Sequence, residues 1–201
     1  VWSTSLSLSQ NKSELISLGD GQDYIILDDV VASGNGSPIR LTPGYPIPSF
    51  WGANNLGTYK TRNDIDTDGR FGTSFLGGPR LEDQNGDGTW NTLDYVYQGS
   101  PEPDLFGGIR NVLSYKKWTL DTFAHFSIGN TMFNGSVAES YYARGAYLNL
   151  LPELKDRWTE ENYMSDIPRA GTAFGTYVTT NETSFQDASF FRLKNVTLTY
   201  D

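Results

Sequence analysis

The chain contains no cysteine and only one histidine, His125. Without cysteine it has no disulfide framework, no thiolate metal site and no cysteine nucleophile. A single histidine cannot build a metal centre from several histidines. A Ser-His-Asp triad would also need His125, which lies in the middle of a predicted strand, so we expect a polar strand residue there instead. These absences point away from an enzyme.

Aliphatic residues and clusters of basic residues are also scarce. Only 37% of the residues are hydrophobic, although aromatic residues make up 14% of the chain and there are 21 glycines. A soluble domain normally has about 45–50% apolar residues to fill its core. Many aromatics and glycines with few aliphatics are typical of a barrel with a polar interior. The net charge of −9 and the lack of any basic run make nucleic acid an unexpected partner.

No apolar run approaches the roughly 20 residues of a membrane helix. The strands of a membrane barrel alternate in polarity and never form such a run, so this absence leaves a barrel open. The chain begins at Val1 and stops at Asp201, both inside strand patterns and without an initiating Met or signal peptide. We therefore expect part of a longer protein.

Polar and apolar residues alternate in four segments. In the first, Trp2 and Leu6 share one face while serines occupy the other. A period of two predicts a strand with one apolar and one wet face. The length of each of the two middle segments is close to that of a tilted strand that crosses a bilayer, about 9–11 residues. The predicted strands are residues 1–9, 104–115, 117–128 and 189–201.

The connections between these strands differ greatly in length. One is a tight turn at Lys116 and Lys117, and the others are residues 10–103 and 129–187. Outer-membrane barrels have short periplasmic turns and long extracellular loops. The sequence therefore predicts a periplasmic lysine turn, two extracellular loops and four crossings of alternating direction. The fold class is all-β, a segment of a large antiparallel transmembrane β-barrel.

Glycine and proline punctuate residues 10–103, which we expect to be largely irregular. Short strands are predicted inside this loop at residues 23–31 and 94–98. In the second loop, residues 136–158 have helical propensity that Gly145 and Pro152 interrupt.

The strongest chemical motif is residues 83–94, DQNGDGTWNTLD, which fits the twelve-residue calcium loop. Oxygen-bearing residues at alternate positions let a chain wrap around a hard cation, and Gly88 stands at the sharp turn. The closing residue is Asp rather than Glu, a shorter arm. We expect a structural Ca²⁺ here, and a metal-free turn is the alternative. The predicted ligands are Asp83, Asn85, Asp87, Thr89 (through its carbonyl), Asn91 and Asp94.

A second acidic segment, Asp64-Ile-Asp66-Thr-Asp68-Gly69, begins in the same way. Phe75 stands where the closing carboxylate would be needed, so a turn is the preferred interpretation over a metal site. Tryptophan and tyrosine residues of the loops could stack on sugars, but in a barrel an aromatic girdle is the commoner role.

Seven segments resemble, in the family's order, motifs from the C-terminal part of SusC/RagA-type TonB-dependent transporters. Residues 44–52 read GYPIPSFWG, where the family has G-x-P-[IL]-x-S-[FY]-[YW]-G. The departures are small; Glu160, for example, stands where the family usually has Pro. The matching segments are residues 44–52, 83–94, 99–104, 113–120, 129–134, 157–169 and 189–200.

The resemblance implies a barrel of about 22 strands around a plug, in the outer membrane of a Bacteroidetes-type Gram-negative bacterium. It also implies import of oligosaccharides or peptides, energised by the TonB complex, with a SusD-like surface lipoprotein as a lid. The rival from another class is a soluble, calcium-stabilised, carbohydrate-binding β-sandwich. That rival explains the alternation and the acidic loop, but not the two very long loops.

Overall fold

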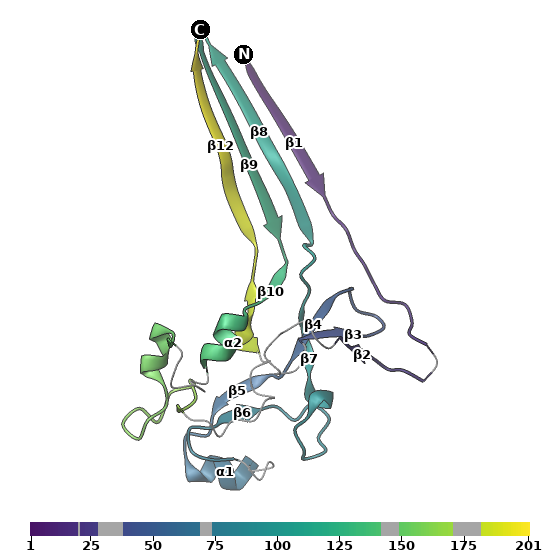
Figure 1. Cartoon of the computed structure of the whole chain (residues 1–201), viewed down its shortest axis with the longest axis vertical. Coiled ribbons are helices and arrows are strands. Elements are labelled where there is room, and N and C mark those ends of the chain that lie inside the picture. Colours follow the sequence, from purple (N-terminus) through teal and green to yellow (C-terminus); the bar gives the residue numbers. More distant parts are fainter. Residues whose placement is uncertain (20, 28–37, 69–73, 142–148, 171–181) are drawn as a thin grey trace.

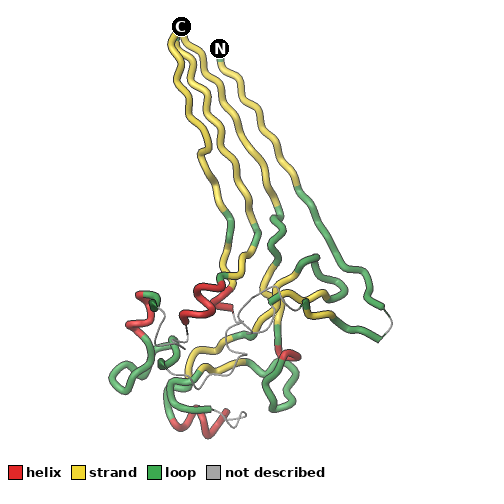
Figure 2. The backbone as a smooth tube through the Cα atoms, in the orientation of Figure 1, coloured by secondary structure: helices red, strands yellow, loops and turns green. Residues whose placement is uncertain are grey.

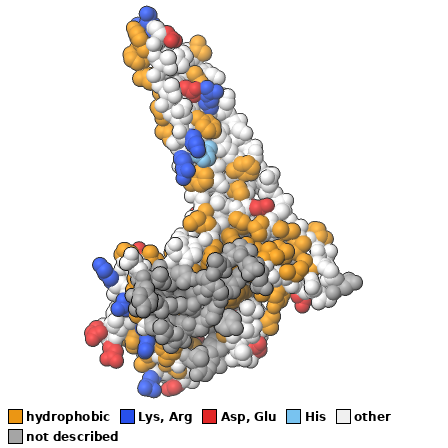
Figure 3. All heavy atoms as spheres, viewed as in Figure 1, with side chains coloured by type: hydrophobic (Ala, Val, Ile, Leu, Met, Phe, Trp, Pro, Cys, Tyr) orange, Lys and Arg blue, Asp and Glu red, His pale blue; other side chains and the backbone are white. Residues whose placement is uncertain are grey.

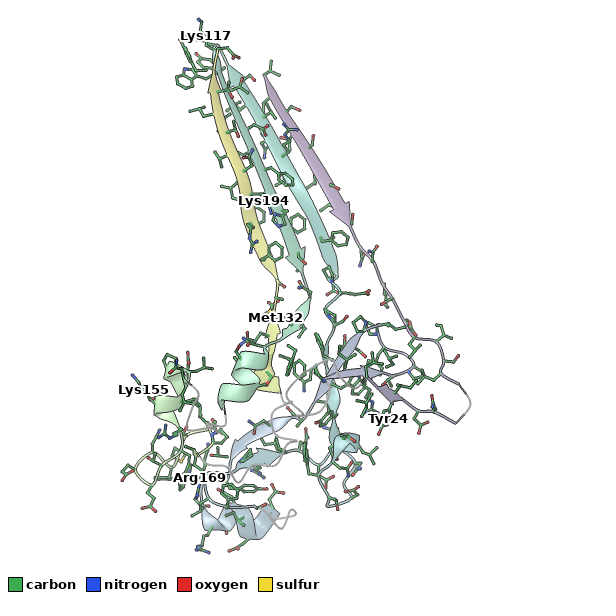
Figure 4. All side chains as sticks on the ribbon, in the orientation of Figure 1. Tyr24, Lys117, Met132, Lys155, Arg169 and Lys194 are labelled. Carbon is green, nitrogen blue, oxygen red and sulfur yellow. The ribbon has the colours of Figure 1, made fainter. Side chains whose placement is uncertain are left out.

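Four long strands form one tall sheet that rises from a lobe of shorter elements (Figure 1). The structure is a computed structural model, and it describes residues 1–19, 21–27, 38–68, 74–141, 149–170 and 182–201. Both termini lie at the end of the sheet far from the lobe, as does the labelled Lys117 (Figure 4). Within the described residues, no helix has the length and apolar character needed to span a membrane.

The tall sheet has the order β1-β8-β9-β12, and every neighbouring pair is antiparallel. Each strand starts and ends within one or two residues of a predicted alternating segment. The strands are β1 (Trp2–Ser9), β8 (Leu105–Tyr115), β9 (Trp118–Ile128) and β12 (Phe190–Tyr200).

The strand register sorts the side chains of the sheet into two faces, because successive residues of a strand point to opposite sides. One row across the first face consists of Leu6, Ile109, Ala124 and Leu193. The next row, on the opposite face, consists of Ser7, Gly108, His125 and Arg192. The sheet thus has one apolar face and one polar face. Figure 3 shows the polar face, with the single histidine beside basic side chains.

Aromatic residues gather on the apolar face at the end of the sheet with the tight turn. Tyr115 pairs with Trp118, and the Trp118 ring packs 4.8 Å from that of Tyr200. Lys116 adopts a left-handed conformation with φ of 57°, so the turn needs only two residues. The cluster thus covers the apolar face at the end of the sheet with the tight turn.

The first long connection is more ordered than the sequence predicts, because many of its strands are too short to show a period of two. It contains two small antiparallel sheets, β2-β3-β4-β7 and β5-β6, which Figure 2 shows in yellow. Short strands were predicted at residues 23–31 and 94–98, and β2 and β7 lie there, whereas β3, β4, β5, β6 and α1 were not predicted. Its elements are β2 (Ile25–Ile26), β3 (Ile39–Leu41), β4 (Ser49–Gly52), β5 (Asn55–Thr58), α1 (Arg62–Asp68), β6 (Pro79–Leu81), η1 (Thr92–Asp94) and β7 (Val96–Gly99).

The second long connection holds short helices and one antiparallel pair, β10 with β11. Of the predicted helical residues 136–158, two parts are helical, and residues 142–148 lie outside the described ones. The elements are β10 (Thr131–Phe133), α2 (Gly135–Tyr141), η2 (Pro152–Asp156), η4 (Glu182–Ser184) and β11 (Phe185–Asp187).

The two long connections pack against each other to form the lobe. The Thr58 hydroxyl donates to the Ser165 carbonyl at 2.6 Å, and Lys60 forms an ion pair with Asp166 at 2.8 Å. The core of the lobe is made by the buried residues Trp51, Ala53, Leu81 and Tyr95, with Tyr45, Phe75 and Trp90 packed against them.

Candidate functional site

The predicted calcium segment, residues 83–94, is a tight loop between β6 and β7. At its start the Asp83 carboxylate accepts the backbone N–H groups of Gly86 at 2.7 Å and Gly88 at 3.0 Å. Both glycines have positive φ, 73° and 78°, which is the region that glycine tolerates best. The sharp turn that the motif predicts at Gly88 is therefore present.

Asp94 ties the end of this loop to its start. Its side chain is fully buried. One carboxylate oxygen accepts the N–H of Gln84 at 3.1 Å, and the other accepts the N–H of Asn91 at 2.8 Å. Asn91 and Asp94 form a capping box at η1, and the Asn91 side chain also accepts the N–H of Leu93 at 2.8 Å. Asp94 thus acts as a hydrogen-bonded staple, a role that the sequence motif did not predict.

The remaining predicted ligands lie toward the outer part of the loop. Asp87 is exposed and accepts the N–H of Thr89 at 2.7 Å and the amide of Asn85 at 3.0 Å. The Thr89 carbonyl accepts the side-chain amide of Asn91 at 3.3 Å. Within the described residues, no three His, Cys, Asp or Glu side chains converge as a metal-binding group. The donor atoms fit Ca²⁺ in kind, since all are oxygens.

The second acidic segment forms helix α1 rather than the expected turn. Thr61 and Asp64 form a capping box: the Asp64 carboxylate accepts the Thr61 N–H at 2.7 Å, and the Asp64 N–H donates to the Thr61 hydroxyl at 3.3 Å. On a helix, residues two apart point in different directions, so Asp66 cannot join Asp64 and Asp68 in a ligand set. Asp68 instead pairs with Arg80 at 2.5 Å.

The hydrogen bonds of this capping box shift the pKa of Asp64 below its ordinary value. The Thr61 N–H is the largest cause, and the Thr61 hydroxyl and the Lys60 N–H add to it against a desolvation effect that raises the pKa. The segment is thus a helix start with a stabilised carboxylate.

An aromatic pocket lies beside the acidic loop, on the face of the β3-β4-β7 sheet. Its volume is about 380 Å³, within the range of about 300–1,000 Å³ that small-ligand sites occupy. Sequence reasoning missed this pocket, since its members come from positions far apart in the chain. The lining residues are Arg40, Tyr45, Trp51, Gln84, Asn85, Leu93, Tyr95, Val96 and Tyr97.

A second hollow, of about 820 Å³, lies mainly over the polar face of the tall sheet near the lobe. His125 lies in it, stacked with Phe123 at 6.5 Å between ring centroids and edge-on to Phe190 at 5.1 Å. Next to it, Arg110 and Asp121 form a two-point ion pair at 3.0 and 2.6 Å. His125 is therefore a polar-face strand residue, as predicted.

No family model matches the chain. Among curated proteins, "TonB-dependent receptor P26" of Formosa agariphila is 40% identical over 202 residues, which cover 100% of this chain and 20% of the relative. "TonB-dependent receptor P3" of the same organism is 30% identical over 211 residues, with the same shares covered. The chain thus spans about a fifth of the length of these relatives.

Two solved structures with the same fold are those of the RagAB peptide transporter and of the RagAB peptide importer in the "closed-closed" state. The first has a TM-score of 0.76 at 23% identity and covers 99% of this chain and 20% of that chain. The second has a TM-score of 0.69 at 24% identity, with 99% and 21% covered. At this level of identity the match shows the fold.

Proposed function

Because the chain belongs to the SusC/RagA-type TonB-dependent transporters, we propose that it forms part of the barrel wall and the extracellular lobe of an outer-membrane importer. The importer takes up oligosaccharides or peptides in a Bacteroidetes-type Gram-negative bacterium. A SusD-like surface lipoprotein delivers the substrate, and the TonB complex supplies the energy. The chain carries out no chemical step, since transport requires none.

The sorting of the tall sheet into an apolar and a polar face is the observation that carries this proposal. A strand of 11 residues such as β8 extends about 37 Å and, tilted by about 45°, crosses about 26 Å, close to the roughly 25 Å apolar band of such barrels. The apolar face then contacts lipid and the polar face lines the lumen. The edge strands β1 and β12 pair with neighbouring strands of the full barrel of about 22 strands.

The same sheet argues against the rival β-sandwich. A sandwich buries one face of each sheet against the other at about 10 Å. All residues of β12 are exposed, and within the described residues the lobe lies beyond one end of the sheet rather than over a face (Figure 1). A soluble domain would leave the whole apolar face in water.

For the acidic loop we propose a structural Ca²⁺. Support comes from the all-oxygen donor set at alternate positions, and from Asp87, which uses about two of the four acceptor positions of its carboxylate in the hydrogen bonds described above. Bound Ca²⁺ would offset the repulsion between Asp83 and Asp87 and stiffen the rim of the lobe.

Two neighbouring positions of β12 test the proposed wall. Val196 pairs with Thr122 on the apolar face, and Thr197 pairs with Asp121 on the polar face. In the full-length transporter, Val196→Arg should reduce the folded protein in the outer membrane at least about tenfold, because arginine facing lipid near the midplane costs about 2–4 kcal/mol. Thr197→Arg should fold normally, because its charge lies on the polar face, in the aqueous lumen.

Folded protein is measured as the heat-modifiable band in outer-membrane fractions, and function as TonB-dependent uptake of fluorescent oligosaccharides and peptides. Equal folding of the two variants would refute the lipid-facing assignment. Uptake that persists without TonB would refute the transport mechanism.

A further inference from the structure

Arg40 is held in the lobe in an unusual way for an arginine. Its guanidinium lies 3.5 Å from the ring centre of Tyr24, labelled in Figure 4, and 4.6 Å from that of Trp51. The Nε atom is buried and has no hydrogen-bond partner. Burial lowers the pKa of Arg40, and the groups that oppose this shift are Tyr24 and Tyr45 rather than a carboxylate. Among the residues that the structure describes, this cation is thus kept partly out of water without a protein anion beside it.

Aromatic rings form the wall of the pocket next to Arg40. Tyr45 packs 4.8 Å from Trp51 and 5.1 Å from Tyr97, and Trp51 and Tyr97 are neighbours in the β4–β7 ladder. Trp51 is buried, whereas Tyr97 is 39% exposed. The pocket is therefore lined by both buried and exposed aromatic rings.

The acidic loop supplies the polar rim of the pocket. Gln84 and Asn85 are exposed lining residues; the Asn85 amide is engaged with Asp87, whereas the Gln84 amide can both donate and accept hydrogen bonds, as sugar hydroxyls require. Asp94 holds the backbone of both residues, because one of its carboxylate oxygens accepts the N–H of Gln84 at 3.1 Å and that of Asn85 at 3.4 Å. The rim is thus preorganised by the staple described above.

From these features we infer that the Arg40 pocket binds an acidic residue of an oligosaccharide, with the carboxylate of a uronic acid or a sulfate ester on Arg40. The inference rests on the proposed import function and narrows its substrate class. The planar guanidinium suits a two-point contact with either anion. The exposed Tyr97 ring stacks on the sugar ring, and the Gln84 amide binds its hydroxyls.

A peptide fits this site less well than a sugar does. Extended peptides commonly bind by adding a strand to the free edge of a sheet. The Arg40 pocket instead lies over the face of three neighbouring strands, β3, β4 and β7. An acidic peptide therefore serves as the competing ligand in the test.

The test measures binding to the full-length transporter in complex with its surface lipoprotein. The ligands are an oligouronate, its carboxyl-reduced neutral form of the same length, a sulfated neutral oligosaccharide and an acidic peptide. Wild type should bind at least one of the two acidic sugars about 10- to 100-fold tighter than the neutral form. Which of the two it prefers distinguishes carboxylate from sulfate.

Arg40→Gln should abolish this preference, and Arg40→Lys should retain part of it because the charge remains without the planar fork. Gln84→Ala, on the exposed rim, should weaken binding of the acidic sugar several-fold, and folding should be unaffected because the side chain is exposed. Arg62→Gln is the matched control: it removes the same charge from an exposed position on α1 and should leave binding unchanged.

Equal affinity for acidic and neutral sugars, tighter binding of the peptide, or full preference in a folded Arg40→Gln protein would overturn the inference. In each of these cases, continued TonB-dependent uptake of neutral sugars or peptides would leave the proposed function standing. Absence of any such uptake would refute the proposed function itself.

Discussion

Gly77 lies at a tight contact between the two long connections. Its φ is +72°, and a Cβ atom added there would lie 2.5 Å from the Trp158 ring. The Arg169 N–H donates to the Gly77 carbonyl at 2.9 Å in the same place. Only glycine combines the left-handed backbone with this contact.

Gly77→Ala should therefore lower the free energy needed to separate the two long connections by about 2–4 kcal/mol, because the costs of backbone strain and of overpacking add together. Hydrogen exchange of the Tyr59 and Trp158 amides, which bond to the carbonyls of Gly78 and Ile167, reports this opening. Gly86→Ala is the matched control: its φ is also positive, but nothing lies within 4 Å of the added Cβ. An equal loss in both variants would show that the contact with Trp158 contributes nothing.

Asp64 makes the start of helix α1 sensitive to acid. Its pKa is lower in the folded chain, chiefly through the Thr61 N–H, than the about 3.9 of an unfolded aspartate. The capping stabilisation is therefore complete above about pH 4 and is lost as the pH falls through the folded pKa. The amides of Lys60 and Thr61, which donate to Asp64, should lose protection from exchange in that window.

Asp64→Asn should remove this pH dependence, because the side chain no longer titrates. Asp66→Asn is the control: this residue lies two positions further along α1 and outside the capping box, so its substitution should leave the pH dependence intact. The measurement is the ratio of protection factors at pH 6 and pH 3. A pH-dependent loss of protection that survives in Asp64→Asn would assign the acid sensitivity to another group.

At the scale of elements, the tall sheet could be predicted from sequence, and so could two strands of the lobe, β2 and β7. The alternation of Trp2, Leu6 and Leu8 with serines marks β1 because a period of two is the signal of a strand. Ile39–Leu41 and Phe50–Trp51 lie in strands of three and four residues, too short for a period to emerge. Their pairing depends on contacts between distant segments, such as Trp51 with Tyr97.

The acidic segments illustrate the same limit. The D-x-N-G-D-G spacing predicts the turn geometry of residues 83–94, since glycines are needed at fixed positions. It does not reveal that Asp94 is a buried staple. At residues 64–68 the same spacing of aspartates lies on a helix, because Thr61 provides a cap that the metal motif ignores. The Arg40 pocket takes Tyr45 and Trp51 from the segment 44–52 and Gln84 and Asn85 from the segment 83–94, but neither motif reveals that the two segments meet.

The acidic loop as an element should respond to removal of Ca²⁺ if it binds that ion as proposed. A chelator should speed protease cleavage within residues 83–94 several-fold and weaken lipoprotein binding, because the carboxylates of Asp83 and Asp87 would then repel each other. Asp87→Asn should show fast cleavage with or without chelator. Asp66→Asn, an exposed aspartate of α1, should behave as wild type. No change on chelation in wild type would refute a stiffening role for Ca²⁺.

At the scale of the whole molecule, the proposed function fixes which end of the sheet faces the cell exterior. The lobe and the turn at Lys116 and Lys117 lie at opposite ends of the sheet (Figures 1 and 4). Short turns of outer-membrane barrels are periplasmic, so the lobe should be outside. Since residues 1–201 contain no cysteine, single cysteines can be introduced here without background from this part of the protein.

Lys117→Cys at the turn and Glu160→Cys in the lobe form the pair for this test, and both positions are exposed. In intact cells an impermeant maleimide should label Glu160→Cys but not Lys117→Cys; after the outer membrane is permeabilised, both should react. Glu153→Cys is a second exposed position in the lobe. It should still be labelled if the surface lipoprotein covers position 160. If Lys117→Cys were labelled in intact cells and the two lobe positions were not, the sheet would have the opposite orientation in the membrane. The Arg40 pocket would then open toward the periplasm, where it could not receive a substrate from a surface lipoprotein.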